Sequence, residues 1–285
     1  MFKTFSTVAG VLLFSCGGVQ VAQAGTFYNG WNYSIDAFDD GSGGSAYEIK
    51  GLAVKETTDS VLFSLTGGAA LTGVPADGPT DGNIGWADMM LNFSGDDYNT
   101  AADNGDLFGI RFAATNDSGV DQVGLYKVDS AIAVYADNNG YDSLKSYYDA
   151  GFGRPNTMGD IATEQAAFDY FGETSSIRSN IGSGTYLGGI TFLTDEEAAA
   201  AGLDFANFDA VSPETHTFKV DRDLLPSANF LISVFLECIN DGIALRSNRT
   251  AVNRSAVNRA DVPEPSAVGG LALVGLLVFK GLRRR

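Results

Sequence analysis

The chain has few of the side chains that usually bind transition metals or act as catalytic nucleophiles. It holds two cysteines, Cys16 and Cys238, and one histidine, His216. Structural zinc sites use four Cys or His ligands, and catalytic zinc sites use about three protein ligands. The count therefore excludes zinc sites built from Cys and His alone. A Ser-His-Asp site would have to use His216, and no serine lies in the Gly-x-Ser-x-Gly sequence of hydrolase nucleophiles.

Positive charge is also scarce. The chain has 18 lysines and arginines against 35 aspartates and glutamates, which gives a net charge of −17. Nucleic acids are polyanions, and an acidic surface repels them, so we expect no nucleic-acid partner. The same surface favours solubility and attracts divalent cations, although it also occurs in proteins without a specific ion site.

The single histidine and the second cysteine lie in patterns that are typical of strands. His216 alternates with the apolar residues Phe218 and Val220, and Cys238 ends a second alternating apolar series that begins at Phe230. Alternate residues of a strand point to the same face. We therefore expect a core or strand-end histidine and a small buried cysteine, rather than a metal ligand and a reactive thiol.

The first residues contain the three parts of a secretory signal peptide. A lysine comes first, a short apolar stretch follows, and Ala22 and Ala24 precede Gly25 in a small-residue cleavage pattern. We predict a signal peptide over 1–24, which signal peptidase removes. The alternative is a lipoprotein signal that acylates Cys16, but a bulky phenylalanine stands where such signals prefer a small residue.

The last residues combine a Pro-Glu-Pro sequence, an apolar segment and a basic cluster, in that order. The first part consists of Val262, Pro263, Glu264 and Pro265, and the basic cluster consists of Lys280, Arg283, Arg284 and Arg285. As a helix, residues 266–282 would span about 25 Å, slightly less than the hydrocarbon thickness of about 30 Å. Long basic side chains can reach the headgroups beyond the end of such a helix, and they predict a cytoplasmic C-terminus.

This arrangement over 262–285 resembles the PEP-CTERM sorting signal. The resemblance implies that a membrane-embedded exosortase recognises the segment and cuts near Pro263-Glu264-Pro265, where the prolines favour an extended backbone. We therefore expect a protein of the cell envelope, anchored in the inner membrane by the helix at 266–282 before processing. After processing it would lie at the cell surface or outside the cell.

The segment 25–245 is predicted to form one extracytoplasmic domain that is rich in strands. Runs with β-forming residues and turn residues at their ends cover 47–54, 60–66, 86–93, 107–114, 123–135, 186–192, 215–220 and 230–238. Several alternate between apolar and other residues, as half-buried antiparallel strands do. With 35 glycines at many junctions, the pattern favours an all-β fold, an antiparallel two-sheet β-sandwich that is jelly-roll-like.

Helical signals are few. Thr194 and Glu197 form a capping box ahead of a short alanine-rich helix, and 143–150 and 163–171 are predicted as two more helices. The last two belong to a predicted insertion over 136–183. Its aromatic residues either pack the insertion onto the domain, which is the commoner role, or line a sugar-binding surface.

The composition changes at Arg246. Arginine, asparagine, serine, alanine and valine dominate 246–261, and Ala251-Val252-Asn253-Arg254 is repeated as Ala256-Val257-Asn258-Arg259. Such a segment has too few large apolar residues for a packed core, so we predict a basic flexible linker between the domain and the sorting signal.

Most acidic residues lie in sequences with ordinary turn chemistry, such as Asp-Asn-Asn-Gly. The candidates for calcium ligands are Asp103, Asp106, Asp137 and Asp142, although no run has the ligand spacing of an EF-hand loop. Structural calcium is the one cofactor that we consider. A glycosidase needs two carboxyl groups across a cleft, which spacing in the sequence cannot reveal.

A second resemblance covers most of the domain. The sequences at 30–36, 85–95 and 108–112 are similar to those of exosortase-dependent surface proteins, whose N-terminal domain has no assigned activity. We therefore predict a non-enzymatic protein with a structural or adhesive role in the polysaccharide or biofilm matrix. The alternative is a secreted, calcium-dependent lectin-like domain or a carbohydrate-active enzyme on a jelly-roll fold.

Overall fold

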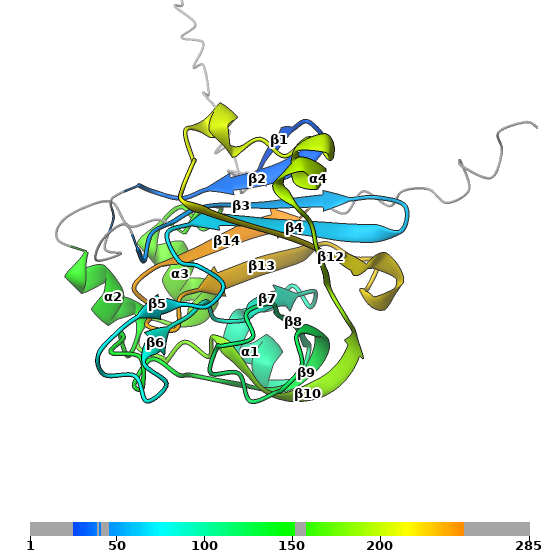
Figure 1. The fold of residues 1–285 in the computed structure, drawn as a ribbon. Coiled ribbons are helices and arrows are strands. Elements are labelled where there is room, and N and C mark those ends of the chain that lie inside the picture. Colours follow the sequence, from blue (N-terminus) through cyan, green and yellow to red (C-terminus); the bar gives the residue numbers. More distant parts are fainter. Residues whose placement is uncertain (1–24, 39, 41–45, 152–157, 248–285) are drawn as a thin grey trace, which may run out of the picture. The chain divides into compact units, whose positions relative to one another are not determined.

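The computed structural model describes residues 25–38, 40, 46–151 and 158–247 (Figure 1). The predicted signal peptide, the linker beyond Ser247 and the sorting signal with its helix at 266–282 lie outside these residues. The described part is mostly β, with antiparallel sheets and few helices, as the all-β prediction requires. Within it, no helix is both long and apolar enough to cross a membrane.

Two six-stranded sheets account for most of the strands. The first sheet has the order β1 (Thr26–Tyr28), β2 (Trp31–Ile35), β3 (Ile49–Glu56), β4 (Ser60–Gly67), β12 (Glu214–Asp221) and β11 (Thr191–Phe192). The second has the order β10 (Asn180–Gly188), β9 (Gly124–Ile132), β8 (Leu107–Arg111), β7 (Met89–Asn92), β13 (Phe230–Phe235) and β14 (Gly242–Ser247). β5 (Val74–Pro75) and β6 (Asn83–Ile84) form a separate pair, and neighbouring strands are antiparallel throughout.

The two sheets share one hydrophobic core. The first sheet contributes Leu52, Val54, Val61, Phe63, Leu65, Phe218 and Val220, and the second contributes Met89, Leu91, Ile110, Leu125, Ile232, Val234, Ile243 and Leu245. Aromatic rings connect them: Phe63 stacks on Phe218 with ring centroids 5.8 Å apart, and Phe218 stacks on Phe112 at 5.4 Å. Burial of these side chains is the main force that holds the sheets together.

Helices cover the outer faces of the sheets. They are α1 (Tyr98–Asp103), α2 (Leu144–Ala150), α3 (Glu164–Phe171) and α4 (Asp195–Ala200), with two 3-10 turns, η1 (Phe205–Phe208) and η2 (Arg222–Leu224). α1, α2 and α3 bury residues such as Tyr98, Tyr147 and Phe171 in a second core with Met90 and Leu231 of the second sheet. On the first sheet, Phe205 of η1 packs with residues of β2, β3 and β4.

The predicted strand faces are confirmed in detail. Phe230, Ile232, Val234, Leu236 and Cys238 all lie in the core between the sheets. The capping box of α4 is present, since the Thr194 side chain accepts from the Glu197 backbone and the Glu197 side chain accepts from the Thr194 backbone. Ser143 and Thr163 cap α2 and α3, the two helices predicted in the insertion.

Other boundaries differ from the prediction. The run predicted at 186–192 contains the end of β10 and all of β11, and β10 begins at Asn180, inside the predicted insertion. β14 extends through Arg246 and Ser247, so two residues assigned to the linker belong to a strand. The aromatic residues Tyr147 and Phe171 of the insertion are buried against the second sheet, which is the packing role that we favoured.

Candidate functional site

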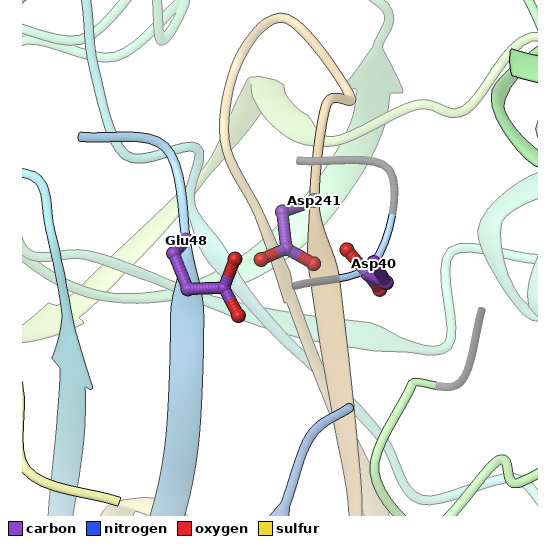
Figure 2. Close-up of side chains that lie close together, drawn as sticks. All are labelled: Asp40, Glu48 and Asp241. Atoms are coloured by element: carbon purple, nitrogen blue, oxygen red, sulfur yellow. The ribbon is translucent and has the colours of Figure 1, made fainter. Parts of the chain in front are cut away.

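Three buried carboxylates from distant parts of the sequence converge at one point, which we call the acidic centre. Its members are Asp40 from the β2–β3 connection, Glu48 directly before β3, and Asp241 in the turn before β14. One carboxylate oxygen from each lies within 4.8 Å of those of the other two. Figure 2 shows the three side chains directed toward one another. The exposed fractions are 3%, 6% and 0%, so the group is closed off from bulk water.

Local hydrogen bonds hold the acidic centre in place. The Asp241 carboxylate accepts from the backbone N–H of Ile49 at 2.6 Å and from that of Gly242 at 2.7 Å. The Tyr147 hydroxyl, on α2, donates to Asp40 at 3.0 Å. The centre therefore joins the start of β3, the turn before β14 and the helical layer.

Burial and mutual repulsion shift the protonation equilibria here. Burial raises the pKa of Asp241 well above its usual value, and the charges of Asp36 and Asp40 raise it further. Asp36, which follows β2, has a pKa that is raised well above its usual value by burial first and then by Asp40. Charging one carboxylate makes charging the next more costly. The arrangement therefore favours bound protons or a positively charged partner.

Carboxylate oxygens are the ligands that hard cations such as calcium and magnesium take. Asp40, Glu48 and Asp241 are the residues that could hold such an ion, because their ligand atoms are close enough to contact one centre. Protons shared among the same oxygens are the other way to lower their repulsion. The positions of the three carboxylates are compatible with a bound cation and with shared protons.

The four predicted calcium candidates lie elsewhere. Asp103, at the end of α1, pairs with Arg178 at 2.7 Å, and Asp142 accepts from the hydroxyls of Ser146 and Ser143. Asp137 is exposed and Asp106 is half-buried. No group of three or more potential ligands in the described part of the chain includes any of these four. The acidic centre was missed because its members are separated by up to about two hundred positions in the sequence.

Two further buried carboxylates have roles in the fold. Asp88 accepts from Asn116 at 2.8 Å, from Ser118 at 2.7 Å and from the Ile181 N–H at 2.7 Å, and burial raises its pKa to about 6. Glu237 accepts three further hydrogen bonds, and burial raises its pKa to about 7. Their exposed fractions are 1% and 0%, which leaves no access for a substrate. They connect the loop after β8 to the second sheet.

The histidine and the cysteine lie as predicted. His216 is 6% exposed, with its Nε2 atom 2.9 Å from the Ala69 carbonyl, and burial lowers its pKa. Cys238 is fully buried, and burial raises the pKa of its thiol to about 12. Neither side chain is placed to act as a base or a nucleophile.

Gly25, the residue after the predicted signal-peptide cleavage site, makes a specific contact. Its backbone nitrogen donates to Asp160 at 2.9 Å, and Asp160 also accepts from the Arg246 N–H at 2.8 Å. A Cβ atom at Gly25 would lie 2.4 Å from the Asn32 side chain and 2.5 Å from the Tyr33 carbonyl. The position therefore requires glycine and brings its nitrogen to a partly buried carboxylate.

The remaining predicted residues belong to the two ends of the sequence. Ala22, Ala24, the Pro-Glu-Pro sequence at 262–265 and the terminal basic cluster lie outside the described residues. No protein-family model matches the sequence, and no curated protein or solved structure matches it.

Proposed function

We propose that the chain is an exported, non-enzymatic surface protein that exosortase processes at 262–265 and that then acts in the extracellular polysaccharide or biofilm matrix. The observation that carries the proposal is the order of Pro-Glu-Pro, apolar segment and basic cluster in the sequence. Before processing, the helix at 266–282 anchors the protein in the inner membrane. Signal peptidase and exosortase are its processing enzymes.

The contact at Gly25 supports the first of the two processing steps. Cleavage before Gly25 would convert its N–H into a charged amino group at the position that already faces the Asp160 carboxylate. An ammonium–carboxylate pair is stronger than the neutral hydrogen bond that it replaces. The mature N-terminus would thus be fixed to the domain.

The finer fold is part of the proposal. The core shared by the two sheets supports a β-sandwich. The strand order gives no support to a jelly roll, because β1–β4 and β7–β10 each lie as consecutive neighbours within one sheet. Jelly rolls instead combine two Greek keys across their two sheets.

The test is intact-mass measurement and C-terminal peptide mapping of the protein from cells and medium, in strains with and without an exosortase. We expect loss of the residues after 262–265 only where the exosortase is present. The matched control replaces Pro263, Glu264 and Pro265 with alanine and should stay unprocessed. A chain that still ends at Arg285 in both strains would contradict the proposal.

Structural calcium is a separate proposal, and the acidic centre is the observation that favours it. Calcium would bind Asp40, Glu48 and Asp241 and connect β3 to the turn before β14. Isothermal titration with calcium should then give saturable binding that Asp241→Asn abolishes. Asp103→Asn, at an exposed predicted candidate, is the control and should bind as the wild type does. Equal binding by both variants would exclude this site.

A further inference from the structure

An open pocket lies at the opposite end of β14 from the acidic centre. It has a volume of about 580 Å³, within the range of about 300–1,000 Å³ that is usual for ligand sites. The end of β7 and the following loop, α3, the start of β13 and the end of β14 form its walls. Residues far apart in the sequence therefore come together around one hollow.

Arg246 supplies the main hydrogen-bond donor of this pocket. Its backbone is fixed, because its N–H donates to Asp160 at 2.8 Å and its carbonyl accepts from Asn32 at 2.9 Å. Its side-chain Nε atom is buried and has no hydrogen-bond partner in the described part of the chain. A guanidinium carries five N–H donors, so those at the terminal nitrogens of Arg246 can bond an acceptor on a molecule in the pocket.

Tyr170 also lines the pocket. Burial is the largest cause that raises the pKa of Tyr170. The Tyr170 oxygen accepts from Asn92 at 3.1 Å.

Phe93 supplies an apolar wall. It is half-buried, and its ring contacts Phe230 with centroids 4.7 Å apart and Phe108 with centroids 5.4 Å apart. These contacts fix the orientation of the ring, and its exposed part lines the pocket. The faces of aromatic rings are electron-rich and attract C–H groups that carry a partial positive charge.

The charged groups of the lining are mostly acidic. Asp96, Asp97 and Asp169 carry carboxylates, against the single guanidinium of Arg246. Such an excess of negative charge disfavours an anionic ligand. A molecule that suits the pocket must both accept from Arg246 and donate to carboxylates while it presents an apolar C–H face.

We propose that this pocket binds a neutral sugar residue. Hydroxyl groups both donate and accept hydrogen bonds, so neighbouring hydroxyls of a sugar satisfy Arg246 on one side and the carboxylates on the other. The C–H face of the ring contacts Phe93. This inference goes beyond the proposed function and does not depend on how either end of the chain is processed.

The test is saturation-transfer difference NMR on the full chain in a zwitterionic detergent, because many mild detergents carry sugar headgroups that would compete. The probes are glucose, galactose, mannose, xylose and their disaccharides, with glucuronate as the anionic comparison. We expect saturable binding of at least one neutral sugar, with the strongest transfer to ring C–H protons. Repulsion by the carboxylates of the lining should make glucuronate bind at least about tenfold more weakly.

Two variants locate the site. Arg246→Lys keeps the charge but removes the planar set of guanidinium donors, and Phe93→Leu keeps apolar volume but removes the ring, so each should weaken binding about tenfold. Asp195→Asn is the control. Asp195 lines a different pocket, beside α4 and η1, so this variant should bind the sugar as the wild type does. Thermal unfolding of each variant checks that the domain is folded.

Three results would overturn the proposal. One is the absence of saturable binding for every neutral sugar with the folded wild-type chain. Another is tighter binding of glucuronate than of glucose. The third is unchanged affinity in both folded pocket variants.

Discussion

At the scale of single residues, the contact between Gly25 and Asp160 links a sequence pattern to the fold. The cleavage pattern predicts Gly25 as the first residue of the mature chain, and the structure places its nitrogen on a carboxylate. Burial raises the pKa of Asp160 here, and its hydrogen bonds from Arg246 and Gly25 act in the opposite direction. A positive amino terminus would act in the same direction as these hydrogen bonds and lower the pKa of Asp160.

Replacing Asp160 with asparagine should therefore destabilise the processed chain. We expect a loss of about 1.5–3 kcal/mol in the free energy of unfolding, the range for hydrogen bonds to charged groups. Urea denaturation measures this loss. The comparison is a chain that keeps Ala24 before Gly25, in which the amino group is displaced and the loss should be smaller. Equal losses in the two chains would show that the amino terminus does not pair with Asp160.

The residue scale also explains why the acidic centre could not be predicted. Asp40 lies in an Asp-Asp-Gly sequence and Asp241 in an Asn-Asp-Gly sequence, and both have the composition of an ordinary turn. Only the pairing of β13 with β14, and the packing of β14 against β2 and β3, bring them to Glu48. The spacing of these residues in the sequence therefore does not predict that they lie close together.

At the scale of elements, the helices α2, α3 and α4, whose caps depend on neighbouring residues, were predicted from the sequence. The α4 capping box and the caps of α2 and α3 depend on residues within a few positions, and all are present. α1 was not predicted, because Asp96-Asp97 has turn chemistry. In the structure the Asp97 side chain accepts from the Thr100 N–H and begins the helix. Aspartate serves turns and helix N-caps equally well, so the sequence alone did not separate the two.

The α4 capping box gives the prediction for this scale. Thr194→Ala removes the side chain that accepts from the Glu197 N–H at 3.2 Å and should lower the free energy of unfolding by about 1 kcal/mol. Thr194→Ser keeps the hydroxyl and should change stability by only a few tenths of that value. Thermal unfolding of both variants measures the difference. A Thr194→Ala protein as stable as Thr194→Ser would mean that this cap does not contribute to the stability of the domain.

At the scale of the whole molecule, the acidic composition and the buried carboxylates predict how stability depends on pH. Burial raises the pKa of Asp36 and of Asp241 well above the usual value. Asp88 and Glu237 are shifted in the same direction, to about 6 and about 7. The folded chain therefore binds more protons than the unfolded chain across the mildly acidic range. By linkage, its free energy of unfolding falls as pH rises from about 4 through these folded-state pKa values.

His216 acts in the opposite direction, because burial lowers its pKa, but it is a single group against several carboxylates. Urea denaturation between pH 4.5 and 8, with a chelator present, should therefore show decreasing stability. Asp241→Asn removes one of the strongly shifted groups and should make the decrease shallower, whereas Asp103→Asn, at the surface, should leave it unchanged. Stability that rises with pH in the wild-type chain would contradict the shifted values.

The effect of calcium on stability distinguishes a bound cation from shared protons at the acidic centre. The ion binds deprotonated carboxylates, so its stabilising effect should grow as pH rises, opposite to the trend in chelator. At one hundred times its dissociation constant it would add about 2.7 kcal/mol, or a rise of about 5–10 °C in Tm for a domain of this size. Sodium chloride at matched ionic strength is the control, because screening of the net charge of −17 needs no site. A calcium effect that equals the sodium effect, or that persists in Asp241→Asn, would assign the acidic centre to shared protons and internal contacts instead.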